Sequence, residues 1–404
     1  MSAEDALIGL TQAKVDDAPV ALMRLCLMDW AVCLIAGRDE PIAAILASGA
    51  SDPASVALTN GAIGHALDYD DTHFDHIGHT SAVICPAVLA LADGADMAAI
   101  LQAIVIGSEA AVRTGLWLGR DHYQLGFHQT ATAGAFGACI AGARLLGLTP
   151  GQTRHAIGLT ATAASGLKGQ FGTMGKPLNA GLAARAGVEA VLWAKAGMTS
   201  AAMGLSAAQG FGPTHAGTAD ESAWDMAEPW KIMRISHKFH ACCHGLHAML
   251  EALIGLPDSV QSLKVMTHPR WLSVCNIQSP TTGLECKFSY PMTAAMALAG
   301  VDTARIANFS DENAADPRLC ALAGKVTVEA DEKLSEMQAR VVAILEDGSE
   351  AVLFHDLSLP MSLDDRAARL TQKARAVVGR ALADDLWDAA HADDPHRLKN
   401  LISY

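Results

Sequence analysis

The stretch Thr130–Gly147, TATAGAFGACIAGARLLG, carries the clearest indication of the fold. Side chains as small as those of Ala and Gly let neighbouring helices approach closely on several sides, so we expect a buried central helix here. The surrounding sequence agrees, because apolar residues recur at helical spacing from the N-terminus to about residue 250, between glycine-containing breaks. No convincing alternating strand pattern interrupts them. This half of the chain is therefore predicted to be a large all-helical domain.

The sequence changes in character after about residue 257. Short β-prone segments appear, SLKVMT, LAGKVTVEAD and QARVVAILEDGSEAVLF, and the last contains Asp347-Gly348 between two apolar runs, a strong hairpin signal. We predict a mainly α protein with a large helical domain at residues 1–257 and a smaller α+β domain at 258–360. A C-terminal helical segment, 361–404, is expected to return to the helical domain.

Composition excludes several classes of partner. The chain has 404 residues, too many for one ordinary core, and its mean hydropathy of +0.22 reflects mostly Ala and Gly. No charge-free, predominantly apolar run reaches eighteen residues, so no membrane span is expected. A formal charge of −14 argues against nucleic acid but permits a small anion in a local basic site. Nine cysteines without repeated CxxC pairs, and no secretory leader pattern, predict a cytoplasmic protein with reduced thiols.

The segment 64–80, GHALDYDDTHFDHIGHT, concentrates four aspartates and four histidines. It has neither HExxH nor EF-hand spacing, which disfavours a metal site, and the DxDxT-like DYDDT follows a helical pattern where a phosphate-transfer motif needs a buried strand. Helix capping, expected for Asp70 and Asp71, accounts for carboxylates but not for this density of histidines. An acid/base site that uses no metal remains the preferred interpretation.

Two further segments supply cations. In SGLKGQFGTMGKPLNAG, a near miss for a P-loop, Pro177 suits the first turn of a helix, which places Lys176 at a helix N-terminus where an anion would be stabilised. HKFHACCHGLHAML brings Lys238 close to several Cys and His residues, without the paired spacing of a structural zinc site. His128 directly precedes the Ala/Gly helix. Histidines, lysines and aspartates together suit general acid/base chemistry on an anionic substrate, in which cations stabilise an enolate-like intermediate.

Four motifs, HALDYDDTH, GFHQTATAGAFGACIAG, FGTMGKPLNAG and HKFHACCHGLHAMLEAL, resemble the MmgE/PrpD family in the same order. That family includes 2-methylcitrate dehydratase, cis-aconitate decarboxylase and iminodisuccinate epimerase. The resemblance covers nearly the whole chain and implies the two-domain fold predicted above, a homodimer, and chemistry on small di- or tricarboxylates without metal or cofactor. It also implies a set of site residues: Asp68, Thr72, His79, His128, Lys176 and Lys238.

Three positions depart from patterns frequent in the family. Asn179 stands where the family often has His, Met292 where an aromatic hydroxyl residue is frequent, and Cys243 where the cis-aconitate decarboxylase pattern has His. Losing the aromatic hydroxyl removes a proton donor, which argues against decarboxylation of cis-aconitate. His73 and His76 are additional basic groups in the acidic segment.

We therefore predict a cofactor-independent lyase or isomerase that abstracts a proton alpha to a carboxylate, foremost a dehydratase or hydratase of the 2-methylcitrate dehydratase type. The alternatives are an epimerase, a cis-aconitate decarboxylase-like enzyme, a non-catalytic carboxylate-binding relative and a metal-dependent hydrolase built on the Asp/His segment. The predicted catalytic residues are His79, His128, Asp68 and Lys176. The predicted substrate-binding residues are Thr72, Lys238, Cys243, His73, Asn179 and Met292, with no metal ligands.

Overall fold

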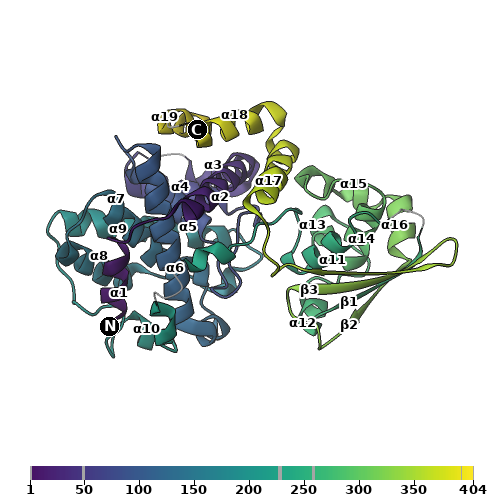
Figure 1. Cartoon of the computed structure of the whole chain (residues 1–404), viewed down its shortest axis with the longest axis horizontal. Helices are drawn as coiled ribbons and strands as arrows, with labels where there is room; N and C mark the ends of the chain where they lie inside the picture. Colours follow the sequence, from purple (N-terminus) through teal and green to yellow (C-terminus); the bar gives the residue numbers. More distant parts are fainter. Residues whose placement is uncertain (1, 48–50, 226–229, 257–259, 393, 404) are drawn as a thin grey trace. The chain divides into compact units, whose positions relative to one another are not determined.

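A computed structural model describes residues 2–47, 51–225, 230–256, 260–392 and 394–403 (Figure 1). The chain forms two compact units, the first comprising Met1–His237 with Val378–Tyr404 and the second Lys238–Val377. The domain boundary expected after residue 257 lies outside the described residues, and the boundary expected after residue 360 stays a prediction. The predicted class, mainly α with one small α+β region, is confirmed.

The first unit is organised around α7 (Gln129–Leu145), in which every residue from the N-terminal end to Ala143 is buried. It packs against α6 (Met97–Leu125) and α9 (Gly175–Lys195) (Figure 1). Glycines make this approach possible, since a Cβ on Gly137 would lie 2.6 Å from the Gly107 carbonyl oxygen. The central buried helix predicted from the Ala/Gly pattern is confirmed.

Two helices bring the acidic segment to this core. α4 (Pro53–Gly64) packs on α9, and α5 (Ser81–Leu91) packs on α7, so the connecting residues 65–80 are fixed at both ends. The remaining helices of the first unit are α1 (Ala3–Leu10), α2 (Asp17–Ala36), η1 (Gly37–Asp39), α3 (Pro41–Leu46), α8 (Pro150–Ala163), η2 (Lys168–Gln170), α10 (Phe211–Thr214), η3 (Glu221–Trp224), η4 (Lys231–Arg234), α18 (Arg380–His391) and α19 (Pro395–Ile402).

Two described helices are long and apolar enough to cross a membrane when up to two charged residues are allowed, Asp17–Asp39 and Met97–Leu125. Neither helix contains a charge-free run of eighteen residues, so neither was expected from the sequence. Within the first unit, 72% and 83% of their most apolar windows are buried. Buried core helices can be as long and as apolar as membrane-spanning helices, so the length and composition of these two helices are weak evidence for a membrane span.

The second unit contains a four-stranded mixed sheet of order β2-β1-β3-β4. β1 (Val260–Thr267) pairs in parallel with β2 (Val326–Ala330) and antiparallel with β3 (Gln338–Leu345), which forms a hairpin with β4 (Glu350–Asp356). The hairpin predicted at Asp347-Gly348 is confirmed, and Gly348 takes the positive φ of 81° that such turns require. The helices of this unit are η5 (His244–Leu246), α11 (His247–Ala252), α12 (Pro269–Val274), α13 (Gly283–Cys286), α14 (Tyr290–Leu298), η6 (Ile306–Asn308), α15 (Asp311–Ala314), α16 (Pro317–Ala323) and α17 (Leu363–Val378).

Candidate acid/base site

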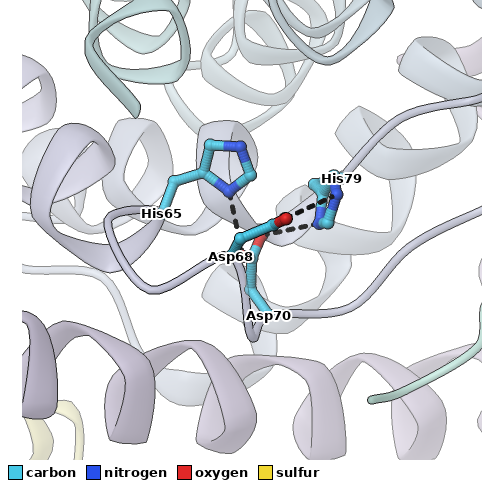
Figure 2. A group of neighbouring side chains, drawn as sticks. All are labelled: His65, Asp68, Asp70 and His79. Carbon is cyan, nitrogen blue, oxygen red and sulfur yellow. Dashed lines mark hydrogen bonds and ion pairs between the residues drawn. The ribbon is translucent and has the colours of Figure 1, made fainter. Parts of the chain in front are cut away.

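A buried carboxylate, that of Asp70, lies between two histidines at the centre of the segment 65–80 (Figure 2). Its Oδ1 is 2.9 Å from His65 Nδ1, and its Oδ2 is 3.2 Å from His79 Nδ1, a contact less well aligned for hydrogen bonding. Burial alone would raise the pKa of the Asp70 carboxyl, but attraction to His65 and His79 holds it well below its usual range. Asp70 was expected to cap a helix, and this prediction is wrong because the side chain turns inward to the histidines.

The local backbone explains how these side chains meet. His65 follows α4 directly, and His79 stands two residues before α5, where its backbone N–H donates to Thr130 Oγ1 of α7 over 3.1 Å. Between them the chain reverses through Asp68, whose φ of 51° is uncommon for a residue other than glycine. The reversal lets residues separated by a loop share one carboxylate.

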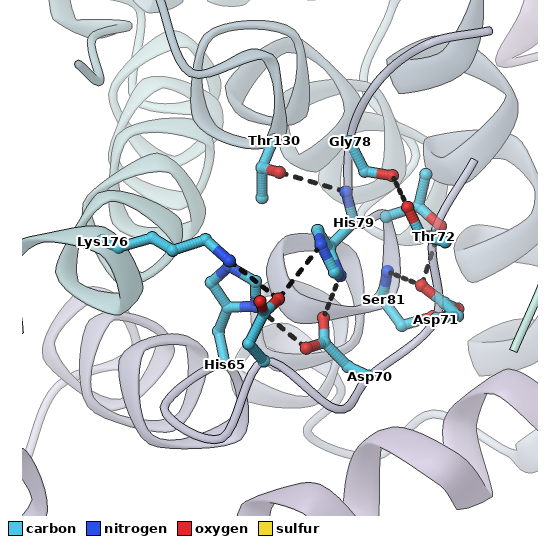
Figure 3. A network of polar contacts seen from close by, with 11 residues as sticks. His65, Asp70, Asp71, Thr72, Gly78, His79, Ser81, Thr130 and Lys176 are labelled. Carbon is cyan, nitrogen blue, oxygen red and sulfur yellow. Dashed lines mark hydrogen bonds and ion pairs between the residues drawn. The ribbon is translucent and has the colours of Figure 1, made fainter. Parts of the chain in front are cut away.

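Lys176 of α9 reaches the same cluster and contacts Asp68 (Figure 3). Its Nζ lies 2.7 Å from Asp68 Oδ1, and the same oxygen lies 3.4 Å from His79 Nε2. Lys176 stands in the first turn of α9, as expected for an anion site at a helix N-terminus. In this structure the anion beside the lysine is the side chain of Asp68, which is 48% exposed.

His128 precedes α7 and is almost fully buried. Its Nδ1 lies 3.3 Å from Asn179 Nδ2, and that amide nitrogen also donates to the Leu167 carbonyl oxygen over 3.2 Å. Because the Leu167 oxygen only accepts, the amide NH₂ must face it, so His128 Nδ1 accepts and the ring proton resides on Nε2. Burial, and then the charge of Lys176, hold the pKa of His128 well below its ordinary value. Neutral His128 is therefore a donor at Nε2.

The tautomer of His79 is the opposite one. The buried Asp70 carboxylate lies 3.2 Å from Nδ1 and the half-exposed Asp68 carboxylate lies 3.4 Å from Nε2. The nearer Asp70 therefore favours a ring proton on Nδ1, and the Nε2 lone pair becomes available when Asp68 turns away. Burial outweighs the attraction of Asp70 and lowers the pKa of His79, so the neutral ring is favoured. The centroids of the His65 and His79 rings are 4.7 Å apart, and those of His65 and His128 are 6.1 Å apart.

Other predicted residues of the segment have mainly backbone partners. Thr72 pairs through its backbone with Ser236, and both nitrogens of His73 are occupied: Nδ1 accepts from the His76 N–H at 3.2 Å and Nε2 donates to the Lys231 carbonyl at 3.0 Å. A direct role of Thr72 and His73 in substrate binding stays a prediction. The His76 ring is fully buried against Gly115, where a Cβ would lie 1.9 Å from its Nδ1.

Three predicted binding residues belong to the second unit. Lys238 and Met292 are buried, and Cys243 is half-buried at the start of η5. The Tyr290 hydroxyl, two residues before Met292, donates to the Gly245 carbonyl oxygen over 2.6 Å and lies 2.9 Å from Thr267 Oγ1. It therefore does not replace the aromatic hydroxyl that position 292 lacks. The binding roles of these three residues stay predictions.

His65 was not among the predicted site residues, and the helix-capping role predicted for Asp70 is wrong. Both lie in the Asp/His segment, so the density of titratable residues was the available signal, but their pairing depends on the chain reversal at Asp68. With Asp68 and His79 they form a group whose ligand atoms lie within 4.8 Å of one another and which could hold a divalent cation. The Lys176 ammonium lies beside Asp68 and two imidazole nitrogens face Asp70, so the contacts of these carboxylates are explained without a metal.

Sequence comparison agrees with the fold. The MmgE/PrpD N-terminal domain matches residues 7–223 and the MmgE/PrpD C-terminal domain matches residues 233–386. The chain belongs to the MmgE/PrpD family, and this confirms the resemblance seen in the sequence.

The chain is also similar to curated members of that family. It is 28% identical to a cis-aconitate decarboxylase-like protein of Aspergillus oryzae over 287 residues, which are 60% of this chain and 59% of the relative. It is 30% identical to the cis-aconitate decarboxylase of Aspergillus terreus over 222 residues, 50% of this chain and 45% of the relative. It is 28% identical to the human cis-aconitate decarboxylase over 172 residues, which are 41% of this chain and 35% of the relative. The chain thus spans about half the length of the curated relatives it matches.

Proposed function

We propose that this protein is a lyase that abstracts a proton alpha to a carboxylate of a small di- or tricarboxylic acid without using a metal or cofactor in that step. One observation carries the proposal: the rings of His79 and His128 both lie near the ring of His65, and their different partners favour opposite tautomers. His79 presents a lone pair at Nε2 and His128 presents a proton at Nε2. A base and an acid at neighbouring positions are what an elimination requires.

The proposed mechanism begins with exchange of one anion for another. A substrate carboxylate takes the place of the Asp68 carboxylate beside Lys176 and beside His79 Nε2, while Asp70 continues to face His79 Nδ1 and orient the ring. His79 Nε2 then removes the α-proton, and the Lys176 ammonium stabilises the enolate-like charge that develops. His128 Nε2–H gives its proton to the departing hydroxyl group as the C–O bond breaks, so that a double bond and water form. The proton taken up by His79 then returns to His128, which restores both neutral rings. Hydration is the same sequence reversed.

Dehydration or hydration is the reaction we propose first, because it uses both histidines. Decarboxylation of cis-aconitate is the second candidate, and the names of the relatives favour it. Met292 argues against it, since a thioether has no proton to give. A homodimer and a cytoplasmic location remain part of the proposal and rest on the family resemblance and on the composition.

The proposal is tested by incubating the protein in deuterium oxide with citrate-, aconitate-, tartrate- and aspartate-like acids and following each by proton NMR. We expect deuterium to enter one α-position and water to be lost or added with at least one acid. Loss of carbon dioxide would select the decarboxylase instead, and inversion without loss of water would select an epimerase. Binding with neither exchange nor elimination for any acid would favour a non-catalytic relative.

The Asn179→Asp substitution tests the role of the His128 tautomer. A carboxylate at this position accepts the ring proton at Nδ1, which leaves Nε2 without one, so we expect kcat to fall by about an order of magnitude or more. The imidazole ¹⁵N shifts of His128 should show the change of tautomer directly. Asn179→Ala is the matched control, because it removes the donor without adding charge. An unchanged kcat in a protein with the altered tautomer would exclude His128 as the acid.

A further inference from the structure

A second group of ligand-type side chains lies outside the acid/base cluster, in the first unit. It consists of Cys26 of α2, Asp71 of the segment 65–80, and His237, the last residue before the second unit begins. All three are buried, and their ligand atoms lie within 4.8 Å of one another. Three residues that are far apart in the sequence thus place a thiol, a carboxylate and an imidazole close together in the protein interior.

The hydrogen-bond donors around Asp71 carry no positive charge. Its neighbour Asp70 faces two histidines. In the described part of the chain, Asp71 accepts hydrogen bonds from Ser81, Thr80 and Cys26, and none of these donors carries a charge. Asp71 is only 1% exposed, and a carboxyl group buried to that degree stays ionised only when a cation lies beside it, and otherwise takes up a proton. The hydrogen bonds from Ser81 are of the kind that hold a metal-binding carboxylate in place.

The geometry of the other two groups suits zinc. Bonds of about 2.3 Å to sulfur and about 2.0–2.1 Å to nitrogen at a tetrahedral angle separate the two ligand atoms by about 3.6 Å. Cys26 Sγ and His237 Nε2 are 3.5 Å apart. A thiol–imidazole hydrogen bond has the same length, so the distance permits either arrangement, and the uncompensated carboxylate favours the metal.

We propose that Cys26, Asp71 and His237 bind one Zn²⁺ ion as a structural site. A water molecule would supply the fourth ligand. The ion would join α2, the segment carrying the acid/base residues, and the chain just before Lys238. This site is separate from the His65, Asp70 and His79 cluster and does not depend on the proposed reaction.

Metal analysis of the purified full chain is the first test. We expect about one zinc ion per chain after gel filtration, removed by prolonged dialysis against a strong chelator and restored by added zinc. Removal should lower the thermal unfolding midpoint. Cys26→Ser should retain little zinc, and Cys33→Ser, which changes another buried cysteine of α2 outside the group, should retain it all.

Cobalt substitution gives a readout that does not depend on whether Cys26→Ser folds well. Cobalt bound by the wild-type protein should show a thiolate-to-metal charge-transfer band in the near ultraviolet. Asp71→Asn should weaken binding while keeping that band at high cobalt concentration. No zinc and no thiolate band in the wild-type protein would overturn the proposal, and so would a band that survives unchanged in Cys26→Ser.

Discussion

Replacing His79 by glutamine is expected to lower the rate of α-proton exchange by about 10²- to 10⁴-fold, because the variant lacks the base at Nε2. Substrate affinity should change little, since Lys176 and not His79 binds the carboxylate in the proposed mechanism. The two quantities can be measured separately, by exchange into deuterium oxide and by calorimetric titration with an unreactive dicarboxylate. His155→Asn, at a histidine of α8 whose Nδ1 accepts from the Ser200 N–H, is the matched control.

The pH dependence of the wild-type protein gives an independent check on the same residue. The groups facing His79 are Asp68, Asp70 and His65. Burial lowers its pKa below the ordinary 6.5 despite the two carboxylates, so the ring remains a neutral base below that pH. Activity should therefore be lost on the acid side only as the pH falls below 6.5. An acid limb centred above 6.5, or an active His79→Gln variant, would remove His79 from the base position.

Replacing Lys176 by methionine is the second change with a large expected effect. The variant loses both the ammonium that binds the substrate carboxylate and the charge that stabilises the enolate, so kcat/KM should fall by about 10²- to 10³-fold. Unlike the His79 variant, it should also bind the unreactive dicarboxylate more weakly. Lys195→Met at the other end of α9 changes the same charge far from the cluster and should behave as wild type. Equal affinity in the Lys176 and Lys195 variants would contradict a carboxylate-binding role.

The elements predicted best were those determined by local chemistry. The Ala/Gly composition of α7 predicts a buried helix because side-chain size limits how near its neighbours come. The turn at Asp347-Gly348 predicts a hairpin because few residues tolerate its backbone angles. Lys176 was placed at a helix N-terminus by the adjacent Pro177.

The pairing inside the acid/base cluster was beyond sequence reasoning for a physical reason. Whether Asp70 caps a helix or binds His65 depends on the direction of the backbone after Asp68, and the left-handed conformation there has no sequence signal at a non-glycine residue. The roles of His73 and His76 could not be predicted either, because their partners also depend on how the backbone folds. His73 is bonded to the backbone of the distant Lys231 and of nearby His76, and the His76 ring is packed against a glycine of α6.

The small residues of α7 have a consequence for how this protein can change through evolution. Ala138 meets Gly187 so closely that a Cβ on the glycine would lie 2.5 Å from the alanine Cβ, and Gly137 meets Gly107 in the same manner. Most substitutions open to Ala or Gly enlarge the side chain, and enlargement in a close-packed core costs about 1–3 kcal/mol or more. Variation in this lineage should therefore accumulate in the segments around the cluster, where substrate preference can change, while the helix beneath them stays nearly invariant.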